Sequence, residues 1–114
     1  MKQIISISIL LLFQLINAQN YNPFEIDKEW LVKIEQLAPS QTTIKNVKKK
    51  KVLVFSKATG FDHWTIPHNA EMLKILGKKT NAFEVHVKYD IEQFDNKNLK
   101  KYDAVVFNNC NPSG

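Results

Sequence analysis

From residue 51 onward, the pattern of apolar and polar residues alternates between strand and helix periods. Residues 52–55 are four consecutive large apolar residues, and residues 103–107 form a similar run after a leading Asp103. Such runs predict strands that are covered on both faces. Between them, residues 83–89 alternate apolar and polar side chains, which predicts a strand with one solvent-facing side, at or near a sheet edge.

Two helical segments join these three strands. Thr65 is suited to cap the first helix, Pro67 to occupy its first turn, and Asn81 to end it in the left-handed conformation. A short helical turn begins at Asp95, ahead of the third strand. Strands that alternate with helices predict right-handed parallel crossovers, and therefore an α/β fold with a doubly wound, flavodoxin-like parallel sheet.

The predicted topology places the half-exposed strand on one side of the first strand and the buried third strand on the other, giving the order 2-1-3. A ligand crevice forms where the strand order reverses, at the carboxyl ends of the strands. The loop at residues 59–63 is therefore predicted to lie beside Asn108 and Asn109. Only 64 residues follow Lys50, and the third strand has no visible partner on its far side. Since so small a domain buries little surface, we expect an incomplete sheet, the amino-terminal part of a longer protein.

The amino-terminal 50 residues have two predicted parts. Residues 1–18 have a basic start, an apolar run and a small residue at Ala18, which predicts a cleaved signal peptide. The run is about 13 residues long and falls short of the roughly 20 needed to cross a bilayer, so we expect export to the periplasm or the exterior and no stable membrane anchor after cleavage. Residues 19–50 predict an amphipathic helix, capped by Asn22 with Pro23 in its first turn and ending before Pro39, followed by a Lys-rich linker. We expect this helix to dock on the domain, with a second chain or a membrane surface as the alternative partners of its apolar face.

Composition and charge change this picture little. The chain is 44% hydrophobic and 24% charged, as in an ordinary globular protein, and its net charge is +5. Five lysines lie within residues 40–51, which contain no acidic residue; removing these five and Lys2 leaves 5 − 5 − 1 = −1 for the rest of the mature chain. We therefore interpret the basic segment as a solvated linker, with contact to an acidic surface as the alternative, and we expect no nucleic-acid partner.

Two blocks carry a resemblance to a known family. The sequence KVLVFSKATGFDHWTIP at residues 51–67 and NLKKYDAVVFNN at residues 98–109 resemble the opening of the ThuA-like (trehalose utilisation) domain family, over roughly residues 49–114. The resemblance implies a class I glutamine amidotransferase-like fold without amidotransferase chemistry, and a connection to carbohydrate metabolism. His63 matches the loop histidine of the family, and Gly60 and Phe61 match its turn. Asp62 stands where many members carry Arg.

Two other chemistries are disfavoured by the residues themselves. Cys110 follows the third strand without the flanking glycines of a nucleophile elbow, so glutamine hydrolysis is not supported. The turn at residues 56–60 superficially resembles a flavin phosphate loop, but Phe61, Asp62 and Trp64 occupy the place where free amides and hydroxyls are needed. Asp62, His63 and His68 have no spacing typical of a metal site. We expect neither a cofactor nor a metal.

The resemblance implies a carbohydrate ligand, and we expect it to bind at the loop after the first strand. Neutral imidazole can act as a general base or donate to a sugar hydroxyl, which makes His63 the candidate catalytic residue. The alternative, that His63 only caps or packs the loop, stays open. The predicted ligand-binding residues are Thr59, Gly60, Phe61, Trp64, His68, Asn108 and Asn109. We expect an exported domain that acts on a trehalose-like disaccharide or an oxidised sugar derivative; the alternative is a non-catalytic sugar-binding module.

Overall fold

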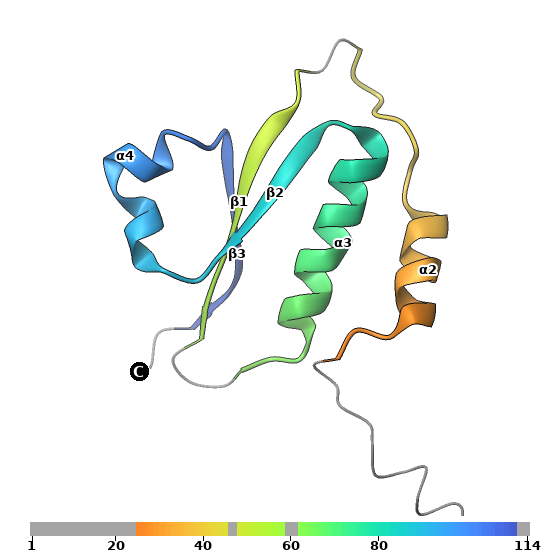
Figure 1. Cartoon of the computed structure of the whole chain (residues 1–114), viewed down its shortest axis with the longest axis horizontal. Coiled ribbons are helices and arrows are strands. Elements are labelled where there is room, and N and C mark those ends of the chain that lie inside the picture. The colour runs from red at the N-terminus through yellow and green to blue at the C-terminus, as the bar shows by residue number, and fades with distance from the viewer. Residues whose placement is uncertain (1–24, 46–47, 59–61, 112–114) are drawn as a thin grey trace, which may run out of the picture.

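The computed structural model describes residues 25–45, 48–58 and 62–111. Its centre is a parallel three-stranded sheet of β1 (Lys50–Ala58), β2 (Phe83–Lys88) and β3 (Ala104–Asn111), in the order β2-β1-β3 (Figure 1). This order confirms the predicted topology and the α/β class. The predicted signal peptide, residues 1–18, lies outside the described residues.

Helices lie on both sides of the sheet (Figure 1). α3 (Thr65–Thr80) connects β1 to β2 on one side, while the 3-10 helix η1 (Ile91–Phe94) and α4 (Asn96–Leu99) connect β2 to β3 on the other. α2 (Lys28–Leu37) forms an outer layer against α3. The predicted docking of the amino-terminal helix on the domain is thus confirmed. Among the described residues, no helix combines the length and the apolar character that crossing a bilayer requires.

The core is built around β1, as its apolar run predicts. Leu53, Val54 and Phe55 are buried, and α3 adds Ile66 and Ala70. Residues of β1 alternate between the two faces of the sheet. Phe55 points to the η1 side, where its ring meets Phe94 edge-on at a centroid distance of 4.8 Å.

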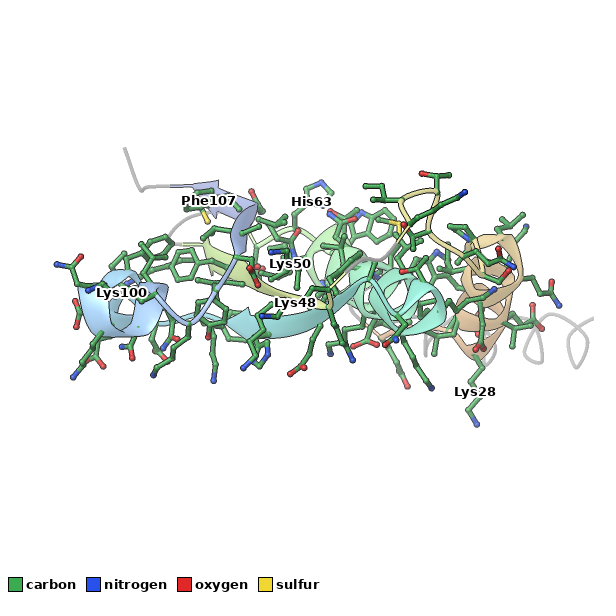
Figure 2. All side chains as sticks on the ribbon, turned by 90° about the horizontal axis from the view of Figure 1, so that it is seen from above. Lys28, Lys48, Lys50, His63, Lys100 and Phe107 are labelled. Atoms are coloured by element: carbon green, nitrogen blue, oxygen red, sulfur yellow. The ribbon has the colours of Figure 1, made fainter. Side chains whose placement is uncertain are left out.

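β3 lies at an open edge of the described sheet, as expected of an incomplete sheet. It pairs with β1 from Ala104 to Phe107 and again from Cys110, and the described residues place no strand on its other side. Consequently Val106 is partly exposed, and Phe107, which stacks on Phe94 at 5.6 Å, remains 63% exposed (Figure 2). The composition of β3 is that of a buried strand, but in the described sheet β3 is an edge strand.

The helix boundaries correct two predictions. α2 does not begin at Pro23: residues 25–27 are not helical, and Asp27 caps the helix by accepting a hydrogen bond from the Glu29 amide at 3.1 Å. The observed cap is the carboxylate of Asp27, five residues after the predicted cap Asn22, which lies outside the described residues. Thr65 is the first residue of α3, not its cap. Asn81 ends α3 with a φ of 52°, as predicted.

The amino-terminal ends of β1 and β3 are joined by Asp103. Its carboxylate accepts hydrogen bonds from the Lys51 amide at 2.8 Å and from Lys50 Nζ at 2.9 Å. The bond from the Lys51 amide, followed by the one from Lys50, lowers the pKa of Asp103 below its ordinary value of 3.8. The lysines at the start of β1, Lys48 and Lys50 among them, are exposed (Figure 2). This end of the sheet lies opposite the carboxyl end, where the candidate site is.

Candidate functional site

A β-bulge shapes the carboxyl end of the sheet. β1 and β3 pair in register from Val52 to Phe55, and the register then shifts, so that Asn108 and Asn109 together face the single residue Ser56. Asn109 takes up the extra length in a left-handed conformation, with a φ of 59°. Asn adopts this conformation more readily than most residues. Bulges of this kind are frequent next to binding sites because they re-aim the side chains around them.

Asn108 ties the end of β3 to α3. Its side chain is 4% exposed. Its Nδ2 donates a hydrogen bond to the Ile66 carbonyl at 2.8 Å, and its Oδ1 accepts one from Asn69 Nδ2 at 3.2 Å. Asn108 therefore contacts the first turns of α3, whereas residues 59–61 of the loop predicted to lie beside it are outside the described residues. Both ends of the Asn108 amide, however, are engaged by the chain itself, so the side chain acts as a structural tie in this structure.

His63 caps the start of α3. Its Nδ1 lies 3.3 Å from the Thr65 amide nitrogen and 2.9 Å from Thr65 Oγ1. A backbone N–H can only donate, so Nδ1 must be the unprotonated acceptor, and the neutral ring carries its proton on Nε2. This is the capping role that the sequence left open as an alternative to catalysis. In this arrangement Nδ1 is occupied, so the neutral ring of His63 cannot act as a base through this nitrogen.

Trp64 and His68 belong to an aromatic cluster that also includes Trp30 of α2. His68 meets Trp30 edge-on at 5.0 Å and Trp64 edge-on at 5.3 Å, measured between ring centroids. Its Nδ1 donates to the Trp64 carbonyl at 3.0 Å. The ring of Trp64 lies 6.0 Å from that of His63 and remains 46% exposed. His68 is thus a packing residue between two tryptophans, whereas Trp64 still presents a ring surface to solvent.

A pocket of about 250 Å³ opens at the carboxyl ends of β1 and β2. Ser56 lies at its inner end, 2% exposed, and its hydroxyl has no hydrogen-bond partner among the described residues. The rest of the described lining consists of Lys57, Asp62, Ile66 and Tyr89. Tyr89, which follows β2, is 60% exposed. A buried hydroxyl without a partner is costly, and it marks a place where a bound molecule could supply the missing bond.

Sequence reasoning missed most of this lining. It placed the crevice between β1 and β3, whereas the pocket lies on the β1–β2 side. The lining depends on register, which the local sequence pattern does not show: Val54 pairs with Val87, and because strand side chains alternate, Ser56 and Tyr89 fall on the same face two residues further on. The predicted residues Thr59, Gly60 and Phe61 lie outside the described residues. Within the described part of the chain, no three His, Cys, Asp or Glu side chains are grouped so that they could hold a metal ion.

Comparison with known proteins gives one finding. A search of curated proteins and a search of solved structures returned no match. A family model described as "Trehalose utilisation" (ThuA) matches residues 51–113. This range starts with β1 and contains α3, β2, the short helices and β3, together with every described residue that lines the pocket. The match covers 63 of the 114 residues, more than half of the chain, and the chain therefore belongs to the trehalose utilisation (ThuA) family.

Proposed function

We propose that this chain is an exported ThuA-family protein that binds a carbohydrate in the pocket at the carboxyl ends of β1 and β2. The observation that carries the proposal is the buried Ser56 hydroxyl, which has no hydrogen-bond partner among the described residues and lies inside a pocket. A sugar hydroxyl can both donate to and accept from this group. Binding would thereby give a hydrogen bond to a hydroxyl whose burial without one is energetically unfavourable.

The remaining lining suits a polyhydroxylated ring. Tyr89 offers an exposed aromatic face with a polar tip, Lys57 offers donors, and the Asp62 carboxylate offers acceptors. Pockets for drug-sized ligands have volumes of about 300–1,000 Å³, so a pocket of about 250 Å³ is suited to a single sugar ring. A trehalose-like disaccharide would place one ring in the pocket and the other outside it, toward solvent.

Two functional classes fit this site. In an enzyme that acts on a disaccharide or an oxidised sugar, His63 would serve as the acid/base or hydrogen-bonding group. In a non-catalytic sugar-binding module, His63 would only hold the loop. One observation supports the binding module, the second candidate. Nδ1 of His63 accepts a hydrogen bond from Thr65, so the basic nitrogen of the neutral ring is not available to take a proton from a substrate.

The test is equilibrium binding and turnover of the full chain with single-ring sugars, trehalose and keto-sugars. We expect Ser56→Ala to weaken binding by about tenfold, the loss of one hydrogen bond of about 1.4 kcal/mol. Ser40→Ala, an exposed serine after α2, is the matched control and should bind as the parent does. Turnover that His63→Ala abolishes would establish the enzyme, whereas binding without turnover would establish the module. If Ser56→Ala and Ser40→Ala bind equally well, the pocket is not the site.

Export is tested separately, by expressing the full-length chain and sequencing the amino terminus of the recovered protein. The proposal predicts a mature protein that begins at residue 19 and is found outside the cytoplasm. Retention of residues 1–18 on a cytoplasmic product would refute export and leave the carbohydrate proposal unaffected.

A further inference from the structure

We propose that α2 is a clamp that fixes Trp64 and, through it, the wall of the candidate sugar pocket. The ligand part of this inference rests on the proposed function, but its structural part does not. α2 ends at Leu37, ahead of residue 51, where the family match begins. The clamp is therefore a feature that this chain adds to its ThuA domain.

Three rings connect α2 to the first turn of α3. Trp30 meets His68 edge-on at 5.0 Å, and His68 meets Trp64 edge-on at 5.3 Å. Edge-to-face pairs at such distances are the favoured arrangement of aromatic rings. The hydrogen bond from His68 Nδ1 to the Trp64 carbonyl fixes the same residue through its backbone. His68 is thus held by Trp30 from one helix while it holds Trp64 at the start of the other.

Lys79 attaches the other end of α2 to the last turn of α3. Its Nζ donates to the Ala38 carbonyl at 2.8 Å, and also to the Glu35 carbonyl. These oxygens belong to the end of α2, where backbone acceptors lack helical partners and a cation is favoured. With contacts near both ends, α2 cannot slide along α3 or tilt away from it without breaking one of them.

The clamp acts on the segment that forms one wall of the pocket. Trp64 lies between Asp62 and Ile66, and both of these residues line the pocket. Ile66 is held from β3 by Asn108. Residues 62–66 are therefore held twice, by Asn108 of β3 and by the ring contacts with α2. Removing the Trp30 ring would release the contact with α2.

The sequence offers a reporter, because Trp30 and Trp64 are its only two tryptophans. In Trp30→Phe, Trp64 is the sole tryptophan and the ring contact with His68 is conserved. In Trp30→Leu, Trp64 is again the sole tryptophan but the ring contact is lost. We expect Trp64 in Trp30→Leu to emit at longer wavelength and to be quenched more strongly by acrylamide than in Trp30→Phe. We also expect sugar affinity to fall by about 2- to 10-fold, the scale of one ring pair.

The control is Val32→Ala in the Trp30→Phe background. Val32 lies on the exposed side of α2, so this change perturbs the helix without touching the ring contacts and should leave Trp64 emission unchanged. Circular dichroism confirms folding of each variant. If Trp30→Leu does not fold, His68→Leu in the Trp30→Phe background removes the middle ring and serves the same comparison.

Equal Trp64 emission and quenching in the Trp30→Leu and Trp30→Phe proteins would overturn the clamp. A change of the same size in the Val32→Ala control would also overturn it, because the effect would then belong to the helix as a whole. If no sugar binds to any variant, the proposed function fails, while the emission comparison still decides whether α2 positions Trp64.

Discussion

The buried amide of Asn108 makes the most direct prediction, because sequence and structure assign it different roles. The sequence placed it among the ligand-binding residues, whereas in the structure it joins β3 to α3. The change Asn108→Asp keeps the shape of the side chain and replaces the donating Nδ2 by an oxygen. That oxygen would face the Ile66 carbonyl, now 2.8 Å from Nδ2. Two acceptors would then meet without a proton between them.

The cost can be worked out from the contact that is lost. Leaving a buried carbonyl without its donor costs about 1–3 kcal/mol. Burial beside a carbonyl oxygen also disfavours the ionised form, so the pKa of the introduced carboxyl should rise above the ordinary value of about 3.9. A raised pKa in the folded state means that the folded state binds the proton more tightly. The variant should therefore regain stability relative to the parent as pH falls through that raised pKa.

The assay is urea unfolding of the full chain at pH 7 and pH 5, followed by tryptophan emission and circular dichroism. Asn96→Asp is the matched control, since it makes the same change on an exposed residue outside this tie and should change the stability by no more than about 0.5 kcal/mol. If Asn108→Asp and the parent have the same stability at pH 7, the tie is not a stabilising contact. Unchanged stability together with a loss of sugar binding would restore the ligand role that the sequence indicated.

Three further changes test other parts of the structure. Ser56→Ala should leave the stability of the unliganded chain unchanged or raise it by up to about 1 kcal/mol in urea unfolding, because it removes a buried hydroxyl that has no described partner; a clear loss would mean that the hydroxyl is bonded within the chain. Asp103→Asn should flatten the acid side of the stability profile. The parent's lowered pKa means that the contribution of Asp103 is present above pH 3.8 and is lost as pH falls through the folded-state pKa, so equal acid unfolding midpoints would contradict the assignment. Gly77→Ala should lower the melting temperature, because the new Cβ would lie 2.5 Å from the Phe83 carbonyl oxygen. That overpacking costs about 1–3 kcal/mol and exceeds the helix-propensity gain of about 1 kcal/mol.

The strand order could be predicted from the sequence because each strand shows its burial in its own composition. The uninterrupted apolar run at residues 52–55 indicates a central strand, and the alternation at residues 83–89 indicates a strand beside it with one exposed face. The end of α3 could also be predicted, because Asn81 is a residue that tolerates positive φ. These features are local, so periodicity and turn chemistry identify them.

The pocket could not be predicted in the same way, because it depends on register. Ser56 and Tyr89 lie 33 positions apart and share a face only because Val54 pairs with Val87. The bulge is a second example. Asn108 and Asn109 look like the polar end of a strand, yet β3 continues past them to Asn111, with Asn109 absorbing one extra residue. Neither the register shift between β1 and β3 nor the burial of Asn108 can be recognised in the local pattern of apolar and polar residues.

The placement of the buried residues supports the choice of the carboxyl end as the functional end. The buried apolar residues lie in the last three positions of β1's apolar run and in the first two turns of α3; they are Leu53, Val54, Phe55, Ile66 and Ala70. Ser56 and Asn108 are the buried polar residues among the described ones, and they lie at that same end. One of them is fully bonded to α3 and the other is left without a described partner. A binding group is most precise when packed elements hold it and its neighbours already have their bonds. Ser56 lies in the packed strand β1, opposite the bonded Asn108, so we expect a ligand that satisfies its hydroxyl to require little rearrangement of these two strands.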